Sequence, residues 1–291
     1  MKRQINAVLK TRGYQITKVP PPKAKKALEP VPLKRRHPRK LKRPAFILST
    51  VRSGSTLLRL LLDSHSKIHS PHEMHLNAIR LDVGGKYGLK ALAEVKLDPA
   101  ERENVMWDWY LHRELASTGK RLLVNKTPSD VWITDRILEC WPDARFIFLL
   151  RHPVSIARSR HELRPQDLDE QNFKRILKYG EAVEAARRSL PGHTVRYEDL
   201  TADPVGETQK LCAFLGVKWE ETMLDYGSHD HGRLRAGLGD WKDNIKTGTV
   251  QPSKPLPAVE EIPPALMDLS IAWGYVPGSA PAGSELERTE H

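Results

Sequence analysis

Short apolar runs alternate with longer segments of helical periodicity through most of the chain. The short runs predict strands at 44–50, 121–124, 145–150 and 193–197. Helical spacing between and after them predicts helices at 55–62, 99–117, 131–140, 153 onward, 173–190 and 206–215. In the second of these helices, the spacing is supplied by Val105, Trp109, Leu111 and Leu115. This alternation favours an α/β fold with a P-loop-like central parallel β-sheet of roughly five strands, flanked by helices on both faces.

The composition fits a single domain with one sizeable core. The chain has 291 residues, of which 39% are hydrophobic and 29% charged, with 22 prolines and two cysteines. Collagen-like, disulfide-scaffold and wholly disordered classes are therefore excluded. No apolar run approaches the roughly 20 residues that span a bilayer, and the start of the chain lacks the apolar core of a signal peptide. Cys140 and Cys212 form no metal-type pair, so we expect a reduced, cytoplasmic setting.

The net charge of +11 is concentrated at the start of the chain. Residues 1–43 hold 15 of the 47 Lys and Arg residues and one of the 36 acidic residues, which leaves 32 basic and 35 acidic residues in the remainder. We predict a basic, proline-rich disordered arm over 1–43, a folded domain over 44–275 and a flexible tail over 276–291. Specific nucleic-acid binding is not expected, because the domain itself is slightly acidic. A short apolar helix face in the arm leaves open a weak contact with an anionic membrane surface, beside a purely solubilising role.

The first predicted strand runs into a loop with the sequence Thr50-Val51-Arg52-Ser53-Gly54-Ser55-Thr56, and a helix follows. A tight glycine turn between a strand and a helix can bind an anion, because free N–H groups and the helix dipole converge there. Against the pattern G-x-x-x-x-G-K-[ST], Gly54 and Thr56 match, whereas Ser49 replaces the first glycine and Ser55 the lysine. The loop is therefore suited to a phosphate group and poorly suited to Mg-ATP, and an ordinary turn is the alternative.

Two further predicted strands also end in basic residues. Arg151 follows the strand at 145–150, and Ser159 lies eight residues later in the next helix. Lys126 follows the strand at 121–124, within the sequence Asn-Lys-Thr-Pro. Since ligands collect outside the carboxyl ends of parallel strands, these residues should line one cleft with Arg52. An arginine and a hydroxyl at such a position can hold a second phosphate.

Taken together and in this order, the motifs resemble the sulfotransferases that use 3′-phosphoadenosine 5′-phosphosulfate (PAPS). Besides the loop and the Arg151–Ser159 pair, the resemblance rests on the sequences VRYEDL at 195–200 and GDWK at 239–242. It covers about residues 44–275 and is similar above all to the tyrosylprotein and bacterial branch, in which an arginine opens the phosphosulfate loop. We therefore expect a bacterial protein.

The resemblance implies a donor site for PAPS at the strand ends. Arg52 would face the 5′-phosphosulfate, and Ser53–Thr56 would surround its phosphate with backbone and hydroxyl groups. Arg151 and Ser159 would bind the 3′-phosphate, which distinguishes this donor from ATP, and Tyr197 would lie near the adenine.

The resemblance also implies further roles, in catalysis and at the 3′-phosphate. Lys126 would stabilise the bridging oxygen as charge develops there, and Glu73 falls at the offset from Arg52 where that branch keeps a catalytic glutamate. Glu73 would then act as general base in an in-line sulfuryl transfer to an acceptor hydroxyl, with Arg52 and Lys126 as the fixed cations. An exposed loop glutamate is the alternative for Glu73. Arg235 and Lys242 would contact the 3′-phosphate, although the glycine spacing before GDWK is one residue shorter than in the family.

Four histidines near Glu73, at positions 65, 69, 72 and 75, raise the question of a metal site. Their spacing differs from H-E-x-x-H and no cysteine accompanies them, so we expect no metal. His72 or His75 is instead the alternative general base.

Two other functions stay open from the sequence. A P-loop kinase or ATPase would share the fold but needs Mg²⁺, and the missing loop lysine argues against it. A non-enzymatic protein that binds its partner through the basic arm would leave the clustered strand-end residues without a role. For a sulfotransferase, the acceptor is open among a carbohydrate, a lipid-linked or nucleoside-type metabolite and a protein tyrosine.

Overall fold

The computed structural model describes residues 38–95, 98–163, 165, 169–231, 245 and 247–276, all within a compact unit that begins at Arg35. Among these residues, five strands form one sheet in the order β2-β3-β1-β4-β5, and every neighbouring pair is parallel. The strands are β1 (Ala45–Ser49), β2 (Ile68–His69), β3 (Leu122–Lys126), β4 (Arg145–Leu150) and β5 (Gly192–Arg196). The predicted parallel α/β sheet is confirmed, and β1 lies at its centre.

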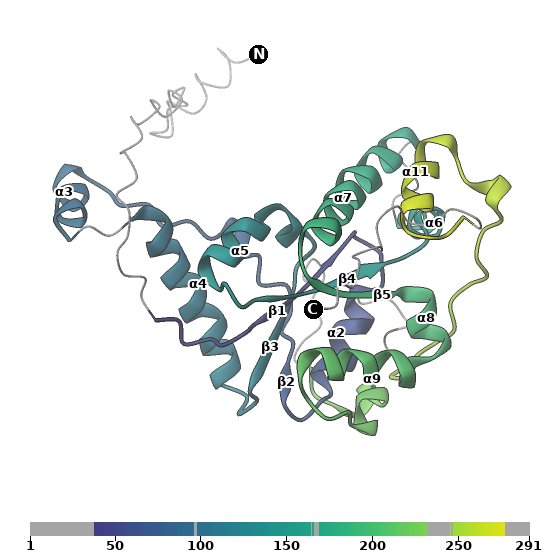
Figure 1. The fold of residues 1–291 in the computed structure, drawn as a ribbon, viewed down its shortest axis with the longest axis horizontal. Coiled ribbons are helices and arrows are strands. Elements are labelled where there is room, and N and C mark those ends of the chain that lie inside the picture. The colour runs from purple at the N-terminus through teal and green to yellow at the C-terminus, as the bar shows by residue number, and fades with distance from the viewer. Residues whose placement is uncertain are drawn as a thin grey trace, which may run out of the picture. The chain divides into compact units, whose positions relative to one another are not determined.

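Helices cover both faces of the sheet (Figure 1). The α-helices of the described residues are α2 (Ser55–Asp63), α3 (Lys86–Glu94), α4 (Pro99–Ala116), α5 (Thr134–Cys140), α6 (Pro153–His161), α7 (Asp169–Ser189), α8 (Tyr197–Ala202), α9 (Pro204–Leu215) and α11 (Pro264–Ala272). Short 3₁₀ helices lie between them: η1 (Leu76–Ala78), η2 (Pro128–Ile133), η3 (Glu221–Leu224), η4 (Tyr226–Ser228) and η5 (Val259–Glu261). One core cluster joins the sheet to α4, α5, α6, α7 and α11, and the other joins it to α2, α8 and α9.

The central strand β1 contributes to both cores. Phe46 and Leu48 belong to the cluster with α4 and α7, whereas Ala45 and Ile47 belong to the cluster with α2 and α9. All four residues are fully buried. A strand buried on both faces has no polar face, which is why its sequence is a continuous apolar run rather than an alternating one.

The buried face of α4 differs from the sequence expectation. Val105 and Trp109 are 39% and 48% exposed, while Trp107 is fully buried. The spacing of apolar residues does not identify the buried face of this helix, because that face also carries the polar side chain of Asp108. Its carboxylate accepts hydrogen bonds from the indole of Trp141 (3.0 Å) and from the backbone of residues 40 and 41 (2.8 and 3.1 Å).

The segment just before β1 belongs to the folded domain, although the sequence placed it in the arm. The guanidinium of Arg39 forms two hydrogen bonds with the Glu101 carboxylate (2.8 and 2.6 Å) and one with the carbonyl of Cys140 (3.0 Å). Leu41 is 2% exposed and lies in the core cluster with α4. The folded part of the chain therefore begins before residue 44, and most of the predicted arm lies outside the described residues, as does nearly all of the predicted tail.

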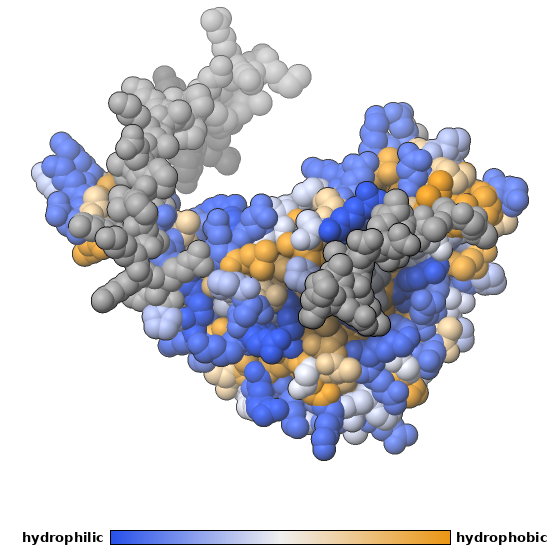
Figure 2. Space-filling model, in the orientation of Figure 1, coloured by the Kyte–Doolittle hydropathy of each residue, from blue (hydrophilic) through white to orange (hydrophobic). Residues whose placement is uncertain are grey.

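Among the strands and α-helices of the described residues, β2, α3, α8 and α11 were not expected from the sequence. The first has two residues, and α3 buries none of its side chains, with Tyr87 83% exposed. Figure 2 shows hydrophobic residues on the surface around α3, among hydrophilic ones. None of the described helices is both long and apolar enough to cross a membrane.

Candidate active site

The loop between β1 and α2 is held in a conformation that requires glycine. Gly54, the residue before α2, has φ +86°, and a Cβ atom there would collide with the ring of Tyr197. Arg52 also has a positive φ, +78°, which is unusual for a residue with a side chain. The hydroxyls of Thr50 and Ser53 are hydrogen-bonded to each other across the turn. The start of α2 thus lines the cleft, at a position where the N-terminal N–H groups of a helix are able to bind an anion.

Arginine side chains from the ends of β1 and β4 meet beside this loop. The Arg52 Nε donates to the Ser159 hydroxyl on α6 (3.2 Å), and Arg151 Nη1 donates to the carbonyl of Arg52 (2.9 Å). The Arg151 guanidinium lies over the ring of Tyr197, 4.4 Å from its centroid. Its Nε is buried and has no hydrogen-bond partner among the described residues. A buried donor without an acceptor is costly, and an anionic ligand is one group that can supply the acceptor.

A lysine and a carboxylate face each other at the ends of β3 and β2. Lys126 Nζ lies 2.6 Å from Glu73 Oε1, with side chains that are 1% and 14% exposed. The loop that carries Glu73 is fixed to the end of β3, because the Thr127 hydroxyl accepts hydrogen bonds from the backbone N–H groups of Met74 (3.1 Å) and His75 (3.3 Å). The pair therefore combines a fixed cation with a partly accessible base.

These groups line one cleft with a volume of about 1160 Å³. Of the residues singled out from the sequence, its lining includes Arg52, Gly54, Ser55, Thr56, Glu73, Lys126, Arg151, Ser159 and Tyr197. Ser53 is fully buried behind the loop. Arg235 and Lys242 lie outside the described residues. The structure thus brings together at one sheet edge most of what the strand ends and the glycine turn predict.

Parts of the cleft wall were missed by sequence reasoning. Arg158 and Arg175 come from α6 and α7, and Tyr226, Thr249 and Lys254 come from the segment after α9. No motif distinguishes these positions from ordinary surface residues.

The four histidines near Glu73 do not converge on one point. His65 Nε2 is hydrogen-bonded to the carbonyl of Lys218 (2.8 Å), and His69 contacts Asp63. The Nε2 of His75 lies 3.5 Å from Glu73 Oε2, so this histidine is beside the candidate base. Among the described residues, no cluster of three or more His, Cys, Asp or Glu side chains is placed to hold a metal ion.

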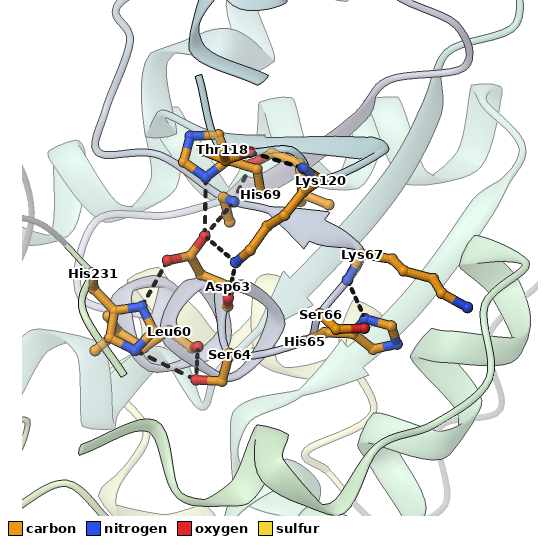
Figure 3. A network of polar contacts seen from close by, with 12 residues as sticks. Leu60, Asp63, Ser64, His65, Ser66, Lys67, His69, Thr118, Lys120 and His231 are labelled. Atoms are coloured by element: carbon orange, nitrogen blue, oxygen red, sulfur yellow. Dashed lines mark hydrogen bonds and ion pairs between the residues drawn. The ribbon is translucent and has the colours of Figure 1, made fainter. Parts of the chain in front are cut away.

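A second polar network lies at the far end of α2 from the loop (Figure 3). The Asp63 carboxylate contacts His231 Nδ1 (2.6 Å), His69 Nδ1 (3.2 Å), the backbone N–H of Ser70 (2.8 Å) and Lys120 Nζ (3.6 Å). Burial alone would raise the pKa of Asp63, but the hydrogen bonds of His231, His69 and Ser70 and the charge of Lys120 hold it well below its usual range. The network joins α2, β2 and the chain after η4, and it has no place in the cleft described above.

Comparisons with known proteins agree on one family. A family model described as "Sulfotransferase family" matches residues 44–221. Protein-tyrosine sulfotransferase 2 from Gallus gallus is 25% identical over 252 residues, covering 80% of this chain and 64% of that protein. Nodulation protein NoeE from Sinorhizobium fredii is 33% identical over 126 residues, covering 39% of this chain and 30% of that protein. The chain thus spans less than two thirds of the length of either relative.

Solved structures of sulfotransferase domains share the fold. The sulfotransferase domain of the Synechococcus PCC 7002 olefin synthase is 27% identical with a TM-score of 0.61, covering 83% of this chain and 98% of that domain. The sulfotransferase domain from the curacin biosynthetic pathway is 26% identical with a TM-score of 0.57, covering 80% of this chain and 98% of that domain. Both are similar to this chain over nearly their whole lengths.

Proposed function

This chain belongs to the sulfotransferase family, and we propose that it transfers the sulfuryl group of PAPS to an acceptor hydroxyl. The observation that carries the proposal is the meeting, in one cleft, of the loop at 50–56, the Arg151–Ser159 side of the site and the Lys126–Glu73 pair. Two phosphate-binding positions with a cation and a base beside them match the needs of a donor that carries a 3′-phosphate and a 5′-phosphosulfate.

The donor side of the cleft fits this substrate residue by residue. The N–H groups at the start of α2 and the side chain of Arg52 would hold the 5′-phosphosulfate. Arg151, whose Nε has no hydrogen-bond partner in the described part of the chain, and Ser159 would hold the 3′-phosphate, and the Tyr197 ring beside Arg151 would pack near the adenine. In this proposal Arg235 and Lys242 add further contacts to the 3′-phosphate.

The Lys126–Glu73 pair supplies the chemistry in our proposal. The acceptor oxygen attacks the sulfur in line and forms a new O–S bond. The bond between the sulfur and the bridging phosphate oxygen breaks at the same time, and adenosine 3′,5′-bisphosphate leaves. The Glu73 carboxylate takes the proton of the acceptor hydroxyl as attack proceeds, and His75 beside it is the alternative base. Lys126 and Arg52 stabilise the negative charge that develops on the bridging oxygen. No step in this scheme uses a metal ion.

The chemistry of the loop favours this donor over Mg-ATP. Ser55 stands where a nucleotide-binding loop has the lysine that reaches the β- and γ-phosphates. Arg151 lies at the end of β4, the strand beside β1, where an NTPase needs an acidic residue to position its magnesium ion. Because both features disfavour Mg-ATP, a kinase or ATPase is only the second candidate.

No contact among the described residues of the cleft identifies one class of acceptor. We therefore propose only that the acceptor is a hydroxyl on a carbohydrate, a small metabolite or a tyrosine. A tyrosine is included because the similar Gallus gallus protein is called a protein-tyrosine sulfotransferase. The bacterial origin, the cytoplasmic setting and a weak contact of the arm with anionic membranes stay predictions of the sequence.

Label transfer tests this function. The protein is incubated with PAPS labelled in its sulfuryl group and with a panel of carbohydrates, hydroxylated metabolites and tyrosine peptides. We expect label to appear on at least one acceptor class with an equal amount of adenosine 3′,5′-bisphosphate released. Transfer of the γ-phosphoryl group of Mg-ATP to the same panel, without sulfuryl transfer, would support the kinase instead.

A further inference from the structure

A buried acid and amide lie near the Lys126–Glu73 pair, and the charges of both members of that pair act on the acid. Asn125 precedes Lys126 in β3, and Asp130 lies in η2, which follows that strand. Both side chains are fully buried, and the Asn125 Nδ2 donates to Asp130 Oδ2 at 2.6 Å. The same turn is closed by the backbone N–H of Asp130, which donates to the carbonyl of Thr127 (2.9 Å). Asp130 is thus part of the turn that directly follows the strand end carrying Lys126.

Each member of this pair has one oxygen left over. Neither Asn125 Oδ1 nor Asp130 Oδ1 has a hydrogen-bond partner among the described residues, and both atoms are buried. Two buried acceptors without a donor are unfavourable, whereas one proton on Asp130 turns its carboxyl into a donor. A protonated carboxyl and an amide are complementary, because each offers one donor and one acceptor to the other. One proton on Asp130 would therefore give the buried oxygens of this pair the hydrogen-bond donor that they lack among the described residues.

The charges around Asp130 point the same way. Burial raises the pKa of Asp130 to about 8, against the lowering effect of the Asn125 hydrogen bond, and the charge of Glu73 raises it while that of Lys126 lowers it. These are the ionisable groups whose charges act on Asp130, although β1, α5, α7 and η1 also pack against η2. An ionised Asp130 would stand near a second carboxylate, that of Glu73, and the two would share the ammonium group of Lys126.

We propose that Asp130 is a positioning residue that keeps its proton at neutral pH, pairs as a neutral acid with Asn125, and so leaves the charge of Lys126 to Glu73 and to the transferred group. If Asp130 were ionised, it would compete with Glu73 and the phosphosulfate for the charge of Lys126, and the strand end would attract a phosphosulfate less strongly. The assignment of Lys126 to the donor rests on the proposed function, whereas the proton on Asp130 does not.

The first experiment tests whether Asp130 is protonated by measuring only the pH dependence of protein stability. In the folded protein Asp130 keeps its proton up to about pH 8, whereas the unfolded chain releases it near the ordinary aspartate pKa of 3.8. Between these values the unfolded chain binds fewer protons than the folded one, so this group makes the protein less stable as pH rises. Asp130→Asn removes the dependence, so its melting temperature should rise relative to wild type from pH 5 to pH 8. The exposed Asp135 in α5 gives the matched control, Asp135→Asn, which should follow wild type at every pH.

The second experiment measures how the proton on Asp130 affects ligand binding in the cleft. Adenosine 3′,5′-bisphosphate is titrated into each variant between pH 7 and pH 9. We expect the wild-type Kd to rise about tenfold over this range, the factor that corresponds to one pKa unit of coupling between two groups. Asp130→Asn, a neutral mimic of the protonated acid, should bind as wild type does at pH 7 and keep that affinity at pH 9.

Three results would overturn the inference. One is a melting-temperature difference between Asp130→Asn and wild type that does not change from pH 5 to pH 8. Another is a failure of Asp130→Asn to fold at pH 7, where the mimic should be the more stable form. The third is a large loss of bisphosphate affinity in Asp130→Asn at pH 7, since the charged carboxylate would then be the functional form. If no variant binds the bisphosphate at any pH, the proposed function fails while the stability series still decides the proton on Asp130.

Discussion

The ammonium group of Lys126 lies 2.6 Å from the carboxylate of Glu73, although 53 residues separate them in the chain. Parallel pairing of β2 with β3 brings the ends of these strands together, and the Thr127 hydroxyl then fixes the loop that follows β2. The pair is therefore a product of sheet topology rather than of local sequence. It places a base and a fixed cation at the edge where the loop before α2 also opens.

Replacement of Glu73 separates catalysis from donor binding. We expect Glu73→Gln to lower the rate of sulfuryl transfer by about 10²- to 10⁴-fold, because the amide cannot take the proton of the acceptor hydroxyl. Adenosine 3′,5′-bisphosphate should still bind, since Lys126 keeps its charge. The exposed Glu139 on α5 provides the control, Glu139→Gln, with wild-type rates. Unchanged turnover in Glu73→Gln would remove Glu73 from the mechanism and leave His75 as the candidate base.

The loop before α2 should not tolerate a side chain at Gly54. Gly54→Ala combines an unfavourable backbone conformation at φ +86° with a collision against the Tyr197 ring. We expect a loss of unfolding free energy of about 1–3 kcal/mol from the strained backbone, and weak bisphosphate binding because the ring must move. Gly119 gives a matched control, because its φ is +70° and no atom lies within 4 Å of its added Cβ. Gly119→Ala should show the backbone cost alone, in urea unfolding, with normal bisphosphate affinity.

Low pH should destabilise the protein, in part because His152 is buried. Burial, together with the positive charges of Arg158 and Arg196, lowers the pKa of His152 to about 4. The unfolded chain takes up this proton near pH 6.5 and the folded protein does not, so the contribution to stability is present above pH 6.5 and is lost as the pH falls towards 4. The loss should be about 2–3 kcal/mol.

Urea unfolding from pH 4 to pH 7 measures this contribution. His152→Asn keeps the hydrogen bond that Nδ1 accepts from the backbone N–H of Val154 at the start of α6, because asparagine is a good N-cap. It should flatten the slope of unfolding free energy against pH. His161→Asn, at an exposed position of the same helix, should leave the slope unchanged. A slope that survives in His152→Asn would assign the acid sensitivity to other groups.

The Asp63 network should stabilise the fold rather than the chemistry. Asp63→Asn removes the negative charge that His231, His69 and Lys120 surround, and it leaves these partly buried groups without the carboxylate they share. We expect unfolding free energy to fall by about 3 kcal/mol, the lower end of the cost of breaking a buried pair. Asp143→Asn, at an exposed position, should change it little. Equal stability of the two variants would show that the network contributes nothing net.

The strand ends and the glycine turn were predictable because each is a local event. The apolar runs of β1 and β4 are buried on both faces, and a basic or glycine-containing turn follows each of them directly in the sequence. Once parallel pairing is assumed, the meeting of Arg52, Arg151 and Lys126 follows. The role of Glu73, by contrast, came only from the family resemblance, because a loop glutamate has no local signature.

What the sequence missed depends on long-range contacts. Trp109 has the right helical spacing yet is exposed, because Asp108 beside it is buried by Trp141 and by the chain before β1. The two-residue strand β2 is too short to show a period, and its place is set by pairing with β3. Asp130 reads as an ordinary turn acid, and only its full burial beside Asn125 reveals a polar pair.

Calorimetric titration with adenosine 3′,5′-bisphosphate measures whether this cleft binds a PAPS-like donor through both of its phosphate positions. Parallel titrations use ADP, and ATP with magnesium, for wild type, Arg151→Ala and the control Arg188→Ala, whose arginine is exposed on α7. We expect metal-independent binding of the bisphosphate that Arg151→Ala weakens by about 10- to 100-fold, the loss expected for charged hydrogen bonds, and that Arg188→Ala leaves unchanged. A preference for Mg-ATP, or bisphosphate binding that is indifferent to Arg151, would contradict this expectation.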